Sequence, residues 1–144
     1  MATFISHNPE ETQTLGEEWG RLARRGWVIG LTGNLGAGKT QLVKGLARGL
    51  GIQGRIQSPT FALINEHREG RVPLYHLDLY RLENRDQVIT AGLEPYLIRP
   101  DGVSVVEWID RWVGEDMRNF QYRRVTINIT GETERTIEYE DFGR

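Results

Sequence analysis

The chain has 144 residues, of which 38% are hydrophobic and 26% are charged, and its net charge is −2. This composition is typical of a globular protein, and the length predicts one domain spanning residues 1–144. The absence of cysteine excludes disulfides and thiolate chemistry, and the slightly acidic balance argues against tight nonspecific nucleic-acid binding by this chain alone. Without a recognisable signal peptide or an apolar run of membrane-spanning length, we expect a cytoplasmic protein with no membrane partner.

The first elements are predicted to be a short strand over residues 3–6 and a helix over Pro9–Arg25. Asn8 is the expected N-cap, since Pro9 and two acidic residues follow it in the first turn. The apolar residues of this segment fall on one face, which is typical of a helix that packs on a core. Thr12 lies in the first turn, where we expect it to be exposed and able to touch a nucleotide base, although nothing nearby requires that role.

Residues 33–40, Gly-Asn-Leu-Gly-Ala-Gly-Lys-Thr, match the pattern of a phosphate-binding loop. An apolar, β-rich run over 27–32 precedes the loop, and an amphipathic helix over 42–50 follows it. Main-chain N–H groups of such a loop, together with the dipole of the following helix, favour a phosphate. Lys39 is then expected to reach the β- and γ-phosphates of a nucleotide, and the Thr40 hydroxyl is expected to ligate Mg²⁺.

The next segment, Gln57-Ser58-Pro59-Thr60-Phe61, allows two interpretations. Proline interrupts any helix here and forces an extended or turn conformation on Ser58. Thr60 then begins a new element, at a place where nucleotide-binding switches often carry a phosphate-sensing loop. A plain Ser-Pro turn explains the same residues.

A hairpin is predicted from strands over 61–66 and 72–80, which flank a charged turn containing glycine. In the second strand, polar residues alternate with apolar ones and share one polar face: His76, Asp78 and Tyr80. An acidic residue in a strand is unusual unless its surroundings use it. Asp78 is therefore either a site residue or a solvent-facing carboxylate paired with Arg81.

Two short helices are expected over 84–91 and 93–98, followed by an apolar strand over 103–108. This strand has the pattern of a parallel strand covered on both faces, and ligands bind at the carboxyl ends of such strands. Glu107 lies at that end and is therefore the preferred carboxylate for Mg²⁺ or for the attacking water, ahead of Asp78. Trp108 either packs in the core or stacks on a partner or substrate.

The remaining candidates are two arginines and a closing hairpin. Arg81 and Arg111 are each either an arginine finger or a member of a surface ion pair. Strands over 124–130 and 135–140 are predicted to form an antiparallel hairpin that extends the sheet. Together these elements predict an α/β fold, a P-loop NTPase-type domain with a mainly parallel sheet.

The motifs also reduce the number of functions that fit the sequence. A guanine-specific Asn-Lys-x-Asp motif is absent, so adenine is the expected base. The hairpin over 61–80 occupies the place where a small-molecule kinase usually has an acceptor pocket and an arginine-bearing lid. An accessory ATPase is therefore the first hypothesis, a small-molecule kinase the second, and a nucleotide sensor without hydrolysis the third.

Four segments together resemble the TsaE (YjeE) family, the small ATPases of bacterial tRNA threonylcarbamoyladenosine (t6A) synthesis. The segments that carry the resemblance are 33–40, 58–61, 75–82 and Glu107-Trp108. The chain departs from the family's usual pattern at Asn34, Gln41 and Ile109-Asp110.

The resemblance implies a three-layer α/β fold with a mixed sheet, and ATP held near Thr12 and along Gly36–Gln41. The nucleotide-contacting residues would be Thr12, Gly33, Gly36, Ala37, Gly38, Lys39, Thr40 and Gln41. The resemblance further implies Mg²⁺ at Thr40 and Glu107, and roles in hydrolysis or in coupling to partners for Thr60, Asp78 and Trp108. The implied partners are the TsaD and TsaB proteins, whose complex modifies adenosine 37 of tRNA.

Overall fold

The computed structural model describes residues 1–33, 38–56, 59 and 63–143. Gly36, Ala37 and Thr60, all predicted site residues, lie outside these ranges. In chain order the elements are β1 (Ala2–Ser6), α1 (Pro9–Leu22), β2 (Val28–Gly33), α2 (Lys39–Gly49), β3 (Ile64–His67), β4 (Leu74–Asp78), α3 (Arg85–Thr90), α4 (Glu94–Leu97), β5 (Val103–Glu107), α5 (Asp110–Val113), a 3₁₀ turn η1 (Met117–Asn119), β6 (Tyr122–Ile129) and β7 (Arg135–Phe142).

The described strands form one mixed sheet in the order β1-β7-β6-β2-β5-β4-β3. The four central strands β6, β2, β5 and β4 pair in parallel, and antiparallel strands flank them on both sides. The predicted C-terminal hairpin is present as β6 and β7. Strand β6 does more than extend the sheet at its edge, because it also pairs in parallel with β2.

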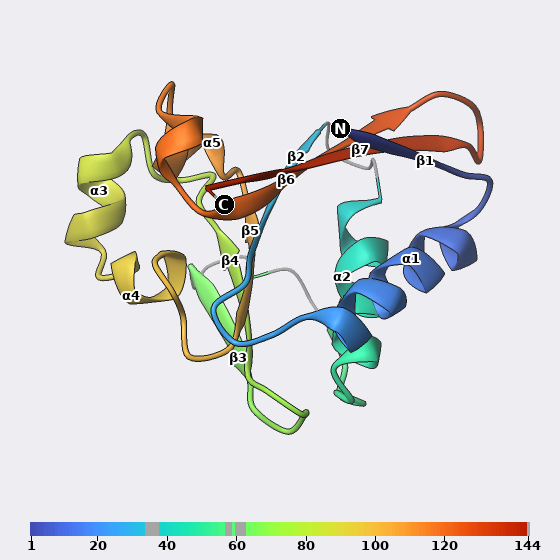
Figure 1. Cartoon of the computed structure of the whole chain (residues 1–144), viewed down its shortest axis with the longest axis horizontal. Coiled ribbons are helices and arrows are strands. Elements are labelled where there is room, and N and C mark those ends of the chain that lie inside the picture. Colours follow the sequence, from blue (N-terminus) through green and yellow to red (C-terminus); the bar gives the residue numbers. More distant parts are fainter. Residues whose placement is uncertain (34–37, 57–58, 60–62, 144) are drawn as a thin grey trace.

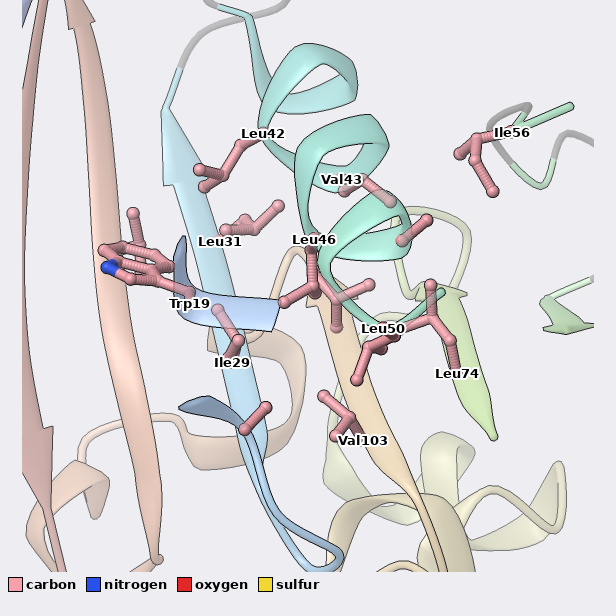
Figure 2. Close-up of a cluster of buried hydrophobic side chains, with 14 of the residues drawn as sticks. Trp19, Ile29, Leu31, Leu42, Val43, Leu46, Leu50, Ile56, Leu74 and Val103 are labelled. Atoms are coloured by element: carbon pink, nitrogen blue, oxygen red, sulfur yellow. The ribbon is translucent and has the colours of Figure 1, made fainter. Parts of the chain in front are cut away.

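Helices cover both faces of this sheet and give three layers (Figure 1). Helices α1 and α2 lie on one face, and α3, α4 and α5 lie on the other. Figure 2 shows the core under α2, where Leu42 and Leu46 meet Ile29 and Leu31 of β2. A second buried cluster lies under α3 to α5 and includes Val106 of β5. Strands that are covered on both faces are mostly apolar, and β5 fits this pattern with valine at 103, 105 and 106 and only the buried Ser104 between them.

Helix α1 begins as the sequence predicted. The Asn8 side chain accepts a hydrogen bond from the Glu11 N–H at 2.8 Å, and Pro9 occupies the first turn. The helix ends at Leu22 and not at Arg25, because Ala23 already has an extended backbone with ψ 144°.

Helices α1 and α2 cross at very close range because glycines line the contact. A Cβ added at Gly45 of α2 would lie 2.0 Å from the carbonyl oxygen of Gln13 in α1. No side chain fits there, so the two backbones touch directly. Near the start of α2, the Gln13 amide donates to Gln41 Oε1 at 2.6 Å. This contact joins the second turn of α1 to the first turn of α2.

None of the described helices combines the length and the apolar character needed to cross a membrane.

Candidate nucleotide-binding site

Three parallel strands end at the same edge of the sheet, and the candidate site lies there. Strand β2 ends at Gly33, β4 at Asp78 and β5 at Glu107. Asp78 and Glu107 are register partners on adjacent strands, and Leu31 of β2 pairs with Glu107 from the other side. Adjacent strands are about 4.8 Å apart, so the two carboxylates are immediate neighbours.

The side of the sheet that these carboxylates occupy follows from the alternation of side chains along a strand. Val103 and Val105 of β5 belong to the cluster under α2. Glu107 follows at the same spacing and therefore lies on the α2 side. Asp78 takes the same side, because Leu74 of β4 packs in that cluster too. Both acids thus lie on the face of the sheet that carries the start of α2.

Lys39 is the first residue of α2 and is only 6% exposed. Its Nζ donates to the Gly33 carbonyl at 3.2 Å and lies 5.5 Å from the centre of the Trp108 ring. Gly38, the N-cap, has φ 99°, a conformation that favours glycine. The ammonium group is thereby directed back toward the end of β2, at the N-terminus of a helix whose dipole favours anions.

His76 corrects one expectation from the sequence. The alternating pattern predicted that His76, Asp78 and Tyr80 form one polar face, but His76 is fully buried and Tyr80 lies in the turn after β4. The His76 ring reaches Glu107, with 2.7 Å between Nε2 and Oε2. His76 and Asp78 do share a face, as the alternation predicted, but Tyr80 does not extend it. The face is buried at His76 because β4 lies inside the sheet, where β5 supplies a partner for the imidazole.

Asp78 is only partly buried. Burial raises the pKa of its carboxyl above the ordinary value. The Tyr80 N–H, which donates to Oδ1 at 3.0 Å, opposes this rise, and the negative charge of Glu107 adds to it. The positive charge of Lys39 acts in the lowering direction. Asp78 is therefore a carboxylate in contact with the site and not a fully solvent-facing one.

Trp108 follows Glu107 in a conformation that non-glycine residues rarely adopt, with φ 62°. Its N–H donates to the Leu31 carbonyl at 3.2 Å. Its ring lies against the exposed Tyr80 ring with 5.1 Å between centroids, and the Arg111 guanidinium lies 5.2 Å from its centre. Strained backbone of this kind occurs often at functional sites. Trp108 therefore lies beside Lys39 and directly after Glu107, where it remains a candidate site residue.

Thr12 is buried, so the prediction that it is exposed is wrong. The packing of α1 on α2 covers its turn, and its hydroxyl lies 2.7 Å from Ser6 Oγ. Thr12 also lines a cavity of about 220 Å³ beside the start of α2. The cavity lining is Asn8, Pro9, Thr12, Gly38, Gln41, Glu132, Thr133 and Arg135.

Glu132, Thr133 and Arg135 line this cavity, and sequence reasoning did not place them there. The segment was predicted as a hairpin turn without function, and no local signal in it points to a ligand. The place of this segment beside Gly38 depends on the pairing of β6 with β2, which joins residues 94 positions apart.

The structure thus brings most of the described candidates to one end of α2. Gly38, Lys39, Thr40 and Gln41 begin the helix, and Gly33, Asp78, Glu107 and Trp108 lie at the strand ends that face it. The described residues contain no group of three or more His, Cys, Asp or Glu side chains that could hold a metal ion.

Parallel strands, strand β2 followed along the chain by helix α2, and acids at the carboxyl edge of the sheet define the class of P-loop NTPase-type domains. Comparison with known families then specifies the member of this class. The family model for the threonylcarbamoyl adenosine biosynthesis protein TsaE matches residues 6–137. The chain belongs to the TsaE family.

Individual relatives agree with this assignment. The tRNA threonylcarbamoyladenosine biosynthesis protein TsaE of Bacillus subtilis is 39% identical over 136 residues, which cover 94% of this chain and 83% of that protein. The protein of the same name from a Nostoc species is 53% identical over 115 residues, or 77% of this chain and 70% of that protein. The crystal structure of Bacillus subtilis YdiB superposes with a TM-score of 0.80 at 36% identity, covering 99% of this chain and 86% of that one.

Proposed function

We propose that this chain is an ATPase that binds and hydrolyses ATP with Mg²⁺ in support of t6A modification of tRNA. The proposed reaction is slow in the isolated chain and stimulated in a complex with the TsaD and TsaB proteins, through which the chain meets tRNA. The observation that carries this proposal is the convergence of Lys39, Asp78 and Glu107 at one edge of the sheet.

The nucleotide would lie across the start of α2. Lys39 would exchange its bond to the Gly33 carbonyl for the β- and γ-phosphates, where its charge offsets theirs. The cavity beside Gly38 and Gln41 has a volume suited to a base, and we assign it to adenine. Thr12 and Thr133 line this cavity and offer hydroxyl groups to the base or the ribose.

The residues present fit a magnesium ion. Mg²⁺ takes oxygen ligands, usually one or two from the protein with the rest from phosphates and water. Thr40, directly after Lys39, and Glu107, opposite it on β5, would supply those protein oxygens. When bound, the ion would offset the negative charge of the phosphoryl oxygens.

Asp78 would act on the attacking water. Its carboxylate is next to Glu107 and is only partly buried, so it can accept a hydrogen bond from a water molecule at the edge of the site. In hydrolysis one water adds to the terminal phosphorus, the bond to the ADP oxygen breaks, and one proton leaves the water. The Trp108 and Tyr80 rings border the same edge and would couple the site to a partner.

The test is ATP hydrolysis measured with and without purified TsaD and TsaB. We expect low turnover alone and a large stimulation by both proteins together, which Lys39→Ala abolishes. Lys44→Ala is the matched control, because Lys44 is an exposed lysine on the same helix. Wild-type turnover in the complete complex that is no higher than that of Lys39→Ala would contradict the proposal. Transfer of labelled phosphate to a metabolite and not to water would favour a small-molecule kinase instead.

A further inference from the structure

The fully buried His76 is a polar side chain that the proposed reaction does not use directly. It lies in the middle of β4, between Tyr75 and Leu77, which are also buried. A polar ring in such surroundings lowers stability unless it finds a hydrogen-bond partner. A role in packing alone would be met equally well by an apolar residue of the same size. Packing in the core therefore does not explain why this position is a histidine.

Among the described residues, the ring has one hydrogen-bond partner, and that partner suggests the role of the histidine. His76 Nε2 lies 2.7 Å from Glu107 Oε2. An ionised carboxylate can only accept a hydrogen bond, so the ring donates through Nε2–H. The second ring nitrogen, Nδ1, is buried and has no partner in the described part of the chain. A neutral ring has one proton to place, and it belongs on Nε2, the nitrogen that has an acceptor.

We propose that His76 is a positioning residue that fixes the carboxylate of Glu107 for Mg²⁺. The Nε2–H bond occupies Oε2 and thereby sets the rotation of the carboxylate group. The other oxygen, Oε1, is then the one available to the metal. This inference rests on the proposed function, because it concerns how Glu107 meets the ion.

The physical basis is that a metal ligand binds more tightly when a second group holds it in the binding orientation. Hydrogen-bond partners of metal ligands typically change metal affinity by about 10- to 100-fold when they are removed. Glu107 is a flexible side chain, and its side chain is 9% exposed at the edge of the sheet. The rigid, fully packed His76 removes that freedom in advance.

The experiment measures the affinity of Mn²⁺, as a stand-in for Mg²⁺, for the chain loaded with ATP, by the electron paramagnetic resonance signal of free Mn²⁺. We expect His76→Leu to weaken Mn²⁺ binding by about 10- to 100-fold. We expect His76→Gln to recover most of the affinity, because its amide places an N–H close to the position of Nε2. The affinity for ATP in the presence of EDTA should stay unchanged in both variants.

His67→Leu is the matched control. His67 is a largely buried histidine on the neighbouring strand β3, with a buried Nε2 of its own, and no hydrogen bond joins it to Glu107 among the described contacts. This substitution should leave Mn²⁺ affinity unchanged. A merely structural role of His76 would give His76→Gln no advantage over His76→Leu.

The outcomes separate this inference from the proposed function. Equal Mn²⁺ affinity in wild type and His76→Leu would overturn the positioning role and leave the proposed function intact. Absence of ATP binding by the wild type would overturn the proposed function itself. If His76→Leu does not fold, nitrogen-15 spectra of histidine-labelled wild type decide the case. A proton on Nε2 and none on Nδ1 supports the inference, and the opposite arrangement overturns it.

Discussion

The crossing of α1 and α2 predicts that adding one methyl group at Gly45 lowers stability. The Cβ of Gly45→Ala would lie 2.0 Å from the carbonyl oxygen of Gln13 and 2.7 Å from its carbonyl carbon. Both atoms belong to the backbone, so relief requires α1 to move away from α2. Helix propensity acts in the opposite direction, because alanine stabilises a helix interior by about 1 kcal/mol relative to glycine.

The magnitude follows from these two opposing terms. Overpacking in a core costs about 1–3 kcal/mol, and contact between two backbones places this case near the upper value. Subtracting the propensity gain leaves a net loss of about 2 kcal/mol in the free energy of unfolding. For a chain of this size, that loss lowers the melting temperature by about 4–8 °C.

The assay is thermal and urea denaturation of Gly45→Ala without nucleotide, with Lys44→Ala as control. Lys44 lies on the exposed side of the same helix turn, so its substitution reports helix propensity without a contact at the crossing. We also expect weaker ATP binding in Gly45→Ala, because displacement of α1 moves Thr12 away from Gln41. A Gly45→Ala chain as stable as wild type, or more stable, would refute the close crossing.

Three further substitutions test separate parts of the structure. Asp78→Asn should raise the melting temperature at neutral pH in EDTA. Folding raises the pKa of Asp78, so the protonated side chain favours the folded state below the unfolded pKa of 3.8, and this contribution is lost as pH rises through the folded pKa. The gain in melting temperature from Asp78→Asn should therefore shrink toward acidic pH. A gain that is the same at every pH would contradict this. Thr12→Val removes the buried hydroxyl contact to Ser6 and should cost about 1 kcal/mol in urea denaturation, whereas no loss would contradict the contact. Leu46→Ala empties part of the core drawn in Figure 2 and should cost about 2–5 kcal/mol, whereas a loss below 1 kcal/mol would contradict its burial.

Short sequence patterns correctly predicted the structural features that depend on neighbouring residues alone. A few adjacent residues determine each of three features: the Asn8 cap, the start of α2 after the glycine-rich segment, and the strand that ends at Glu107. Such features depend on backbone conformation and on side-chain alternation, which a short segment determines largely by itself.

The features that sequence reasoning missed depend on contacts between distant segments. The alternation around His76 is the same for a half-exposed strand and for an inner strand with a buried histidine. Only the pairing of β4 with β5 supplies Glu107 as its partner. Thr12 is buried for a similar reason, since α2 packs on its turn. Glu132 lines the cavity beside Gly38 because strand β6 pairs in parallel with β2, and no hairpin pattern predicts that pairing.

The most direct test of the central claim is calorimetric titration of the folded chain with ATP in the presence of Mg²⁺. A nucleotide site at the start of α2 predicts one ATP bound per chain, with binding lost in Lys39→Ala and retained in Lys44→Ala. If the wild type takes up no ATP, or if Lys39→Ala binds it as tightly as Lys44→Ala does, the nucleotide site proposed at this edge of the sheet is wrong.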